Sequence, residues 1–421
     1  MLRFALPVLL LWLSTSVHAA TWTVRPGESI QAAINAAAAH DTVSVERAHY
    51  RENLVFDKPL TLKGIDRPTL DGGYHGDTIR IRSPQVTIDG LIVINSGADL
   101  EKQNAGIYLQ PGSDSTRILN CDIVYNLFGL WIETSKDVEI RDNLIAGKRD
   151  LMSQHRGNGI QLYNTEGAQI IGNNISFVRD GIYVDVSHHA VFARNRIHHV
   201  RYGTHYMNSH NNVWEDNDSY YNRGGLALMM TRNQVIRNNR AWGNSDHGIM
   251  LRTIQDSVIE NNVVAGNARG FFIYDAEFNT LRNNLVVDND VGVHLWAGSY
   301  RNQAEGNDFI SNRTQIKYVA SRDEIWGKGG GNYWSNYVGW DRNGDGIGDV
   351  QYEANDMVDR LSWRHPMMKL LLASPAVQTL RLVSQQFPLL RAPSIVDPKP
   401  HMQPTHPDWS QWRGRQFPHP D

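Results

Sequence analysis

Apolar and polar residues alternate in short segments along most of this chain, and a glycine opens nine of these segments. The segments Gly-Ile-Tyr-Val at 181–184 and Gly-Ile-Met-Leu at 248–251 are typical. Successive glycines are 22 or 23 residues apart, with one interval of 30. A period of two predicts strands with one buried face, and the regular interval predicts stacked coils. The nine glycines are Gly106, Gly129, Gly159, Gly181, Gly203, Gly225, Gly248, Gly270 and Gly292.

A second column of residues repeats with the glycines. About fifteen residues after each glycine lies an asparagine, or a cysteine in the first copy. Asparagine tolerates the left-handed backbone of a sharp corner, and stacked copies can hydrogen bond from coil to coil. The pattern predicts an all-β, right-handed parallel β-helix, because the consensus of a leucine-rich repeat is absent. The column is Cys121, Asn143, Asn174, Asn195, Asn217, Asn239, Asn262, Asn284 and Asn307.

The composition outside the repeats predicts five regions. Residues 1–19 form a signal peptide, and residues 20–320 form the β-helix, whose open end is covered by a helix over Ile30–Ala39 that Ser29 caps. Residues 321–358 are rich in glycine, aspartate and aromatics. Residues 359–392 mix apolar and basic residues with helical spacing, and 393–421 is a proline-rich tail expected to be flexible. The 30-residue interval contains an inserted loop, 147–158, and insertions in solenoids often mark a binding face.

Charge and cysteine content narrow the class of protein. The chain has 41 basic and 44 acidic residues and a net charge of −3, so we expect no nucleic-acid partner. Cys121 is the only cysteine, so no disulfide can form within the chain. Export by the signal peptide predicts a soluble protein outside the cytoplasm.

Four residues on the glycine-led strands suggest a soft-metal site. The second and fourth residues after each glycine should face solvent, which places His205, Met207, Met229 and Met250 on three consecutive coils about 4.8 Å apart. Thioether and imidazole ligands favour Cu(I). The alternative is that these side chains are apolar residues covered by the inserted loop or by a partner protein.

A second candidate metal site follows the coils. Oxygen-bearing side chains alternate from Asp341 through Asn343 and Asp345 to Asp349, with a glycine at the sixth position, as in the first nine residues of a calcium loop. The twelfth position holds Tyr352 in place of a glutamate. A structural Ca²⁺ site and a glycine-rich turn with solvated aspartates both fit this segment.

An enzyme on this fold is the main alternative from another class. Polysaccharide lyases, hydrolases and epimerases on β-helices need paired carboxylates, or a base with a cation. Glu133 and Asp185 are the only carboxylates among the fourth positions, and they are two coils apart. We therefore expect no catalytic residues, although a periplasmic lyase or epimerase stays an alternative.

Motifs near the C-terminus carry a specific resemblance. Residues 331–349 read GNYWSNYVGWDRNGDGIGD, residues 359–375 read DRLSWRHPMMKLLLASP, and residues 386–390 read QFPLL. On these motifs the chain closely resembles the NosD family, the periplasmic maturation proteins of nitrous oxide reductase. The resemblance covers almost the entire chain and implies a non-enzymatic assembly component.

The resemblance also implies partners. Proteins of this family work with an ABC-type ATPase and permease in the inner membrane, a lipoprotein copper chaperone and nitrous oxide reductase, whose copper-sulfide centre they help to complete. In such a role the methionine-bearing face would have a protein to which it supplies copper. The transporter would hold the protein at the membrane. A segment suited to docking on the permease begins with Trp363, His365, Met367 and Met368, although it could also cap the last coil. A scaffold that binds no metal is the third hypothesis.

Overall fold

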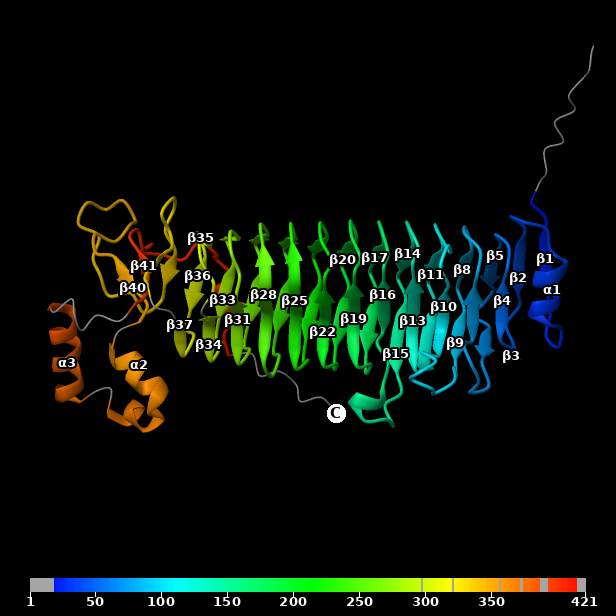
Figure 1. Ribbon diagram of the computed structural model, residues 1–421, viewed down its shortest axis with the longest axis horizontal. Helices are drawn as coiled ribbons and strands as arrows, with labels where there is room; N and C mark the ends of the chain where they lie inside the picture. The colour runs from blue at the N-terminus through cyan, green and yellow to red at the C-terminus, as the bar shows by residue number, and fades with distance from the viewer. Residues whose placement is uncertain are drawn as a thin grey trace, which may run out of the picture.

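The protein is an elongated parallel β-helix with small appendages at its ends (Figure 1). The computed structural model describes residues 19–296, 298–319, 322–355, 357–371, 374–386 and 393–414. Three parallel sheets of 13, 12 and 13 strands run along the axis, and each strand pairs with its equivalents in the neighbouring coils. The predicted fold class is confirmed.

The 12-stranded sheet contains eight of the nine repeat glycines, with Gly159 immediately before one of its strands, and we call it the glycine sheet. Its strands are β4 (Leu54–Phe56), β7 (Ile79–Ile81), β10 (Ala105–Leu109), β13 (Phe128–Glu133), β16 (Ile160–Tyr163), β19 (Asp180–Asp185), β22 (Tyr202–Met207), β25 (Gly224–Arg232), β28 (His247–Gln255), β31 (Arg269–Tyr274), β34 (Val291–Leu295) and β37 (Thr314–Tyr318).

The two 13-stranded sheets form the other walls. The first consists of β1 (Thr21–Val24), β2 (Thr42–Val45), β5 (Thr61–Gly64), β8 (Thr87–Asp89), β11 (Arg117–Leu119), β14 (Glu139–Arg141), β17 (Gln169–Ile171), β20 (Val191–Ala193), β23 (Val213–Glu215), β26 (Val235–Arg237), β29 (Val258–Glu260), β32 (Thr280–Arg282) and β35 (Gln303–Glu305). The second consists of β3 (His49–Arg51), β6 (Thr69–Asp71), β9 (Ile92–Ile94), β12 (Asp122–Asn126), β15 (Leu144–Gly147), β18 (Asn174–Ser176), β21 (Arg196–His198), β24 (Asp218–Tyr220), β27 (Arg240–Trp242), β30 (Val263–Ala265), β33 (Leu285–Val287), β36 (Asp308–Ile310) and β39 (Tyr333–Trp334).

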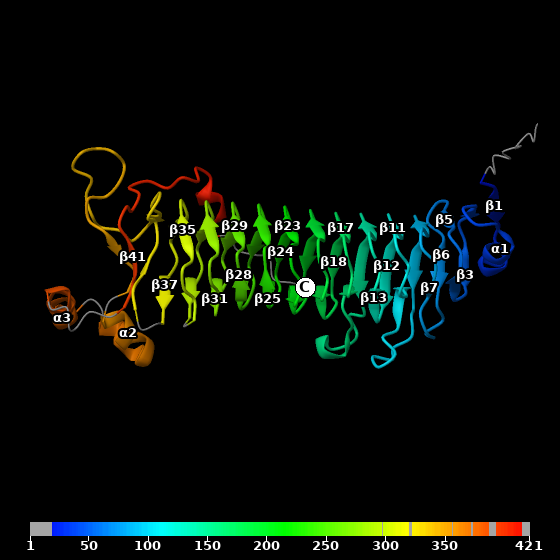
Figure 2. The same ribbon diagram turned by 45° about the horizontal axis from the view of Figure 1, so that its top comes forward.

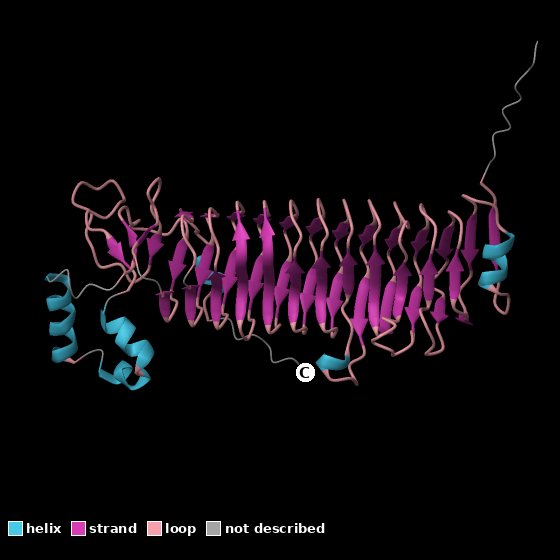
Figure 3. Cartoon of the chain, viewed as in Figure 1, coloured by secondary structure: helices cyan, strands magenta, loops and turns pink. Residues whose placement is uncertain are grey.

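Helices in the described residues lie near the two ends, in the inserted loop and in the tail (Figure 3). They are α1 (Ile30–Ala36), η1 (Ser153–His155), α2 (Met357–Arg364), η2 (Pro366–Leu371), α3 (Pro375–Gln386) and η4 (Trp409–Trp412). Three short strands form a small sheet beyond the last coil, namely β38 (Glu324–Ile325), β40 (Tyr352–Glu353) and β41 (Ile395–Asp397). None of the helices in these described residues is long and apolar enough to cross a membrane.

The core is a continuous column of apolar side chains inside the three sheets. In β19, Ile182 and Val184 are fully buried, whereas Tyr183 between them is only half-buried. Larger rings stack in the same way as the smaller side chains, and Phe192 lies 3.9 Å from Trp214 of the next coil, ring centre to ring centre. The first and third residues after each repeat glycine therefore point inward, as the period of two predicted.

Buried asparagines form a hydrogen-bonded ladder at one corner of the helix. The backbone N–H of Asn195 donates to Oδ1 of Asn217 at 3.0 Å, and the Nδ2 of Asn195 donates to the same oxygen and to the carbonyl of Ile170. The ladder comprises Asn143, Asn173, Asn195, Asn217, Asn239, Asn262, Asn284, Asn307 and Asn332. Cys121 stands at its start and donates its backbone N–H to Asn143.

The prediction was wrong for one position of the asparagine column. Asn173 is fully buried and belongs to the ladder, whereas Asn174 is exposed at the start of β18. Neighbouring residues of an extended chain point to opposite sides, so only one of two adjacent asparagines can face inward. Two further ladders occupy other corners, one through Asn222, Asn244, Asn267, Asn289 and Asn312, and one through Gln234, Ser257, Asn279 and Asn302.

Caps cover both ends of the solenoid. Helix α1 buries Ile30 and Ile34, and Ser29 Oγ accepts the N–H of Ala32, but the helix ends at Ala36, because Ala37 is already extended. At the other end, Asn355 Oδ1 accepts the N–H of Tyr318 on the last strand of the glycine sheet. The second 13-stranded sheet continues to β39, beyond the predicted end of the β-helix at residue 320, because Tyr333 and Trp334 pair with β36.

The tail differs from the expectation of flexibility. Residues 393–414 run back along the solenoid (Figure 2), where Trp412 packs against Leu285 and Ile310. His406 Nδ1 bonds to Oδ2 of Asp308 at 2.6 Å, and Asp308 is fully buried. The packed tryptophans, and the partner that His406 provides for a buried carboxylate, hold this segment on the solenoid despite its proline-rich composition. The predicted signal peptide and the last seven residues, 415–421, fall largely or wholly outside the described residues.

Asn173→Ala should lower the free energy of unfolding by at least about 2 kcal/mol, because it leaves buried groups of Asn143 and Ile140 without partners. Asn174→Ala is the matched control one residue away and should change stability by less than about 0.5 kcal/mol. Urea denaturation of both variants measures the difference. Equal losses would show that the ladder does not stabilise the fold.

The contact of His406 with Asp308 should make stability depend on pH. The hydrogen bond to Asp308 raises the pKa of His406 despite its burial. The contact therefore stabilises fully below the unfolded pKa of about 6.5 and is lost as pH rises through the raised folded pKa. The melting temperature of the wild type should exceed that of His406→Gln most at about pH 6, and the gap should shrink as pH rises above about 6.5 and through the raised folded pKa. A constant gap would contradict this.

Candidate functional site

The outer face of the glycine sheet presents side chains in columns. The strand register sets Tyr183, His205, Ala227, Met250, Phe272 and His294 side by side on six consecutive coils. In a second column, Asp185 lies beside Met207, Met229 lies beside Arg252, and Arg252 lies beside Tyr274. Continuing the register by one residue places Met207 beside Met229. The structure thus brings the four predicted copper ligands onto three neighbouring strands, β22, β25 and β28.

A third column of the same face was missed by the sequence analysis. Cross-strand pairing passes over the repeat glycine and includes the residue before it, as where Asp180 pairs with Tyr202. Asp180 contacts the outward-facing His205, which places this column on the outer face. The signal was present in the sequence, since these residues share the spacing of the glycines. The column includes Asp180, Tyr202, Gly224, His247 and Arg269.

His205 is held in place by a buried carboxylate. Its Nδ1 lies 3.0 Å from Oδ2 of Asp180, whose side chain is 1% exposed. Arg201 donates from Nε to the other carboxylate oxygen at 2.8 Å. Burial alone would raise the pKa of Asp180, but the hydrogen bonds from His205 and Arg201 lower it below its ordinary value. Nε2 is thus the ring nitrogen of His205 that can bind a metal, in the carboxylate–histidine arrangement common at metal sites.

The three methionines differ in accessibility. Met207 and Met229 are half-buried, and the Tyr183 hydroxyl donates to Sδ of Met207 at 3.9 Å. Met250 is only 9% exposed. Ala227 is fully buried although it points outward, which means that larger neighbours on the face close over it. His205 and Met250 stand on either side of Ala227, so these two candidate ligands flank the smallest side chain of the column.

His247 of the third column is a candidate ligand that the sequence analysis missed. Its ring is 2% exposed, and Nε2 finds no hydrogen-bond partner among the described residues. A Cβ atom on Gly224 would lie 2.5 Å from this nitrogen, so glycine is required beside it. The Tyr202 ring lies 5.5 Å from the ring of His205 and 5.6 Å from that of His247. Burial lowers the pKa of His247 and keeps its ring neutral, as metal binding requires.

Another histidine of this face lies further along the sheet. His294 is 6% exposed, and its Nε2 also lacks a hydrogen-bond partner within the described part of the chain. Burial, with Lys317 and Arg269, lowers the pKa of His294 to about 4. Its ring stacks on Trp296 at 5.2 Å. His294 lies two strands from Met250, with Phe272 on the strand between them. This histidine therefore belongs to an aromatic extension of the face.

Four further histidines form two pairs. His188 stacks on His210 at 5.3 Å, and His198 contacts His199 with its ring centre 4.9 Å away. Within the described residues, no three His, Cys, Asp or Glu side chains are grouped to hold a metal ion.

The predicted calcium loop is closed by its own hydrogen bonds. Asp341 accepts the backbone N–H groups of Gly344 at 2.7 Å and Gly346 at 2.8 Å. Asp345 accepts from Asn343 Nδ2 at 3.0 Å, and Asp349 accepts the N–H of Arg342 at 2.7 Å. These hydrogen bonds fit a glycine-rich turn and also the folded backbone of a calcium loop. Calcium binding stays a prediction.

The four predicted docking residues lie beside the last coil. Trp363 on α2 is half-buried, with the ammonium of Lys317 on β37 5.8 Å from its ring centre. His365 and Met367 are exposed, Met367 by 74%, and Met368 is half-buried. Trp363 therefore covers the end of the glycine sheet, while His365 and Met367 face solvent.

The carboxylates considered for catalysis do not face each other. The strand register places Tyr163 between Glu133 and Asp185. The Tyr108 hydroxyl donates to Glu133 at 2.5 Å, and Asn208 donates to Asp185 at 3.3 Å. Each carboxylate is thus held by its own neighbour.

Comparison with known proteins identifies relatives along most of the chain. The family model NosD, described as a periplasmic copper-binding protein, matches residues 141–339. A probable ABC transporter binding protein NosD from Pseudomonas aeruginosa is 39% identical over 374 residues, covering 85% of this chain and 87% of that protein. The protein of the same name from Stutzerimonas stutzeri is 36% identical over 369 residues, covering 84% of this chain and 85% of its own.

Solved structures share the fold at low sequence identity. The A-module of a mannuronan C-5 epimerase from Azotobacter vinelandii has a TM-score of 0.58 and 16% identity, covering 73% of this chain and 93% of the module. At that identity the likeness shows the β-helix alone.

Proposed function

The chain belongs to the NosD family, and we propose from this that it works in the periplasm as a copper-handling component in the maturation of nitrous oxide reductase. Its cargo is Cu(I), received from a copper chaperone lipoprotein and passed toward the copper-sulfide centre of the reductase. The single observation that carries the proposal is the grouping of His205, Met207, Met229 and Met250 on three adjacent strands of one face.

The ligand chemistry of this face supports a transferable ion. Thioethers are soft, neutral ligands that favour Cu(I) over Zn²⁺. Met207 and Met229 are half-buried, so an incoming protein can reach them, whereas Met250 lies deeper beside Ala227. His205 adds a stronger ligand whose ring is fixed through Asp180. His247 on β28, two strands from His205, offers a second imidazole nitrogen that has no hydrogen-bond partner among the described residues.

The far end of the molecule is suited to a transporter. The names of both relatives refer to ABC transporter binding, and the exposed Met367 and His365 lie where the solenoid ends. We propose that this end docks on an inner-membrane permease, whose ATPase partner supplies the energy, while the copper face stays accessible to the reductase. The signal peptide over residues 1–19 would direct the chain to the periplasm.

We also propose that the protein is not an enzyme. Tyr163 separates Glu133 from Asp185, and each carboxylate has a hydrogen-bonding neighbour. A retaining or inverting glycosidase needs two carboxylates that face each other across the scissile bond.

The copper proposal predicts loss of binding in a conservative variant. Met207→Leu/Met229→Leu/Met250→Leu keeps side-chain volume and should keep the fold, but removes three thioethers. An anaerobic Cu(I) titration against a competing chelator should show tight binding by the wild type and affinity at least about tenfold weaker in the variant.

The matched control is Met152→Leu/Met367→Leu/Met402→Leu, which removes three thioethers outside β22, β25 and β28. It should bind Cu(I) like the wild type. Equal binding by both triple variants would refute the assignment of the face, and no binding by the wild type would favour a scaffold that holds no metal.

The non-enzymatic proposal predicts no activity on uronate polymers. The purified protein, incubated with alginate or polygalacturonate, should release no unsaturated product by ultraviolet absorbance and change no C-5 configuration by proton nuclear magnetic resonance. The epimerase module that shares the fold serves as the positive control for alginate. Turnover that Glu133→Gln or Asp185→Asn abolishes would establish the enzyme alternative.

A further inference from the structure

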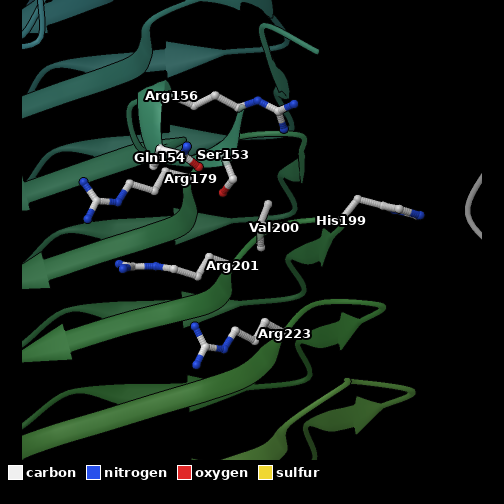
Figure 4. A pocket seen from close by; sticks show the side chains of 8 residues that line it. All are labelled: Ser153, Gln154, Arg156, Arg179, His199, Val200, Arg201 and Arg223. Carbon is white, nitrogen blue, oxygen red and sulfur yellow. The ribbon is translucent and has the colours of Figure 1, made fainter. Parts of the chain in front are cut away.

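Three arginines stand in a row at the edge of the glycine sheet. Arg179, Arg201 and Arg223 immediately precede β19, β22 and β25, and the N–H of Arg201 donates to the carbonyl of Arg179 at 2.8 Å. Figure 4 shows their side chains extending in the same direction from consecutive coils. Because the coils stack in register, three consecutive coils each place one arginine at this edge of the sheet.

The inserted loop closes one side of this row and makes a pocket. Ser153, Gln154 and Arg156 of the insert line it together with His199, and its volume is about 440 Å³. Arg156 is fixed, because its guanidinium donates to the carbonyls of Leu151, Arg149 and Phe177. The 30-residue interval of the sequence thus supplies a wall of the pocket.

Two of the arginines have no counter-ion among the described residues. Arg201 is paired with the buried Asp180, but Arg179 and Arg223 form no ion pair with any described residue. Several arginines elsewhere on the solenoid meet a carboxylate of the preceding coil, as Arg237 meets Glu215, Arg240 meets Asp218 and Arg282 meets Glu260. Because Arg179 and Arg223 lack such a partner, the pocket gathers positive charge on a chain whose net charge is −3.

Arg149 adds a positive charge near His199, which lines the pocket. Arg149 is held with its guanidinium carbon 3.7 Å from the ring centre of Phe177. Burial lowers the pKa of His199, and Arg149 lowers it further, so the ring favours its neutral form. The positive charge of the pocket therefore comes from its arginines.

We propose that this pocket is a binding site for a multivalent anion, held by the guanidinium groups of Arg179 and Arg223 with Arg201 between them. Guanidinium forks bind carboxylate and phosphate oxygens in pairs, and three levels of coil span more than one anionic group. The anion is either a free oxyanion or the clustered carboxylates of an acidic protein segment. The site does not depend on copper, although Asp180 joins its Arg201 to His205 of the copper face.

The test compares Arg179→Gln/Arg223→Gln with Arg47→Gln/Arg232→Gln, which makes the same change in net charge at exposed residues away from the pocket. Isothermal titration of copper-free protein at low ionic strength uses two probes, pyrophosphate and a peptide of four consecutive aspartates. We expect the wild type and the control to bind at least one probe, and the pocket variant to bind it at least about tenfold more weakly. Added salt should weaken binding.

The probes distinguish the two sources of the anion. Saturation by pyrophosphate alone would assign a free oxyanion, and tighter binding of the peptide would assign an acidic protein segment. Both support the pocket. Equal binding by the two double variants, or no binding of either probe by the wild type, would overturn it. Because the four substituted arginines are exposed, circular dichroism should show the same fold in all proteins.

Discussion

Every feature of this protein depends on the hydrogen-bonded register between one coil and the next. Backbone bonds between parallel strands hold each residue about 4.8 Å from its equivalent, but backbone bonds alone would allow a coil to slip. The buried asparagines prevent this, because each carboxamide must accept the N–H of one neighbour and donate to the carbonyl of another. A slip would leave those groups unpaired in a low-dielectric interior, where each costs about 1–3 kcal/mol.

The same register turns a repeated position into a surface feature. On the outer face of the glycine sheet it converts a scattered set of residues, separated by more than twenty positions, into adjacent side chains. The outward residues on this face differ in size from coil to coil. Gly224 and Ala227 are two small residues on β25, with His205 on the strand to one side and His247 and Met250 on the strand to the other. The extra residues of the inserted loop form one wall of the arginine pocket.

The two candidate sites meet at one buried carboxylate. Asp180 accepts from Arg201 on the side of the pocket and contacts His205 on the side of the copper face. Since Asp180 is 1% exposed, loss of Arg201 would leave a buried carboxylate without its positive partner. This shared group fixes the orientation of His205 and ties its geometry to the coil that carries the arginines.

The sequence by itself determined the fold class, the coil boundaries and the presence of His205, Met207, Met229 and Met250 on one face, because strand alternation and a fixed repeat length are local properties. It also placed α3 over Pro375–Gln386. It could not distinguish Asn173 from Asn174, show that His247 stands beside Gly224, or show that the tail returns to Asp308. Those outcomes depend on which side chains meet across coils or over nearly a hundred residues, and only the packed structure decides which polar groups find partners.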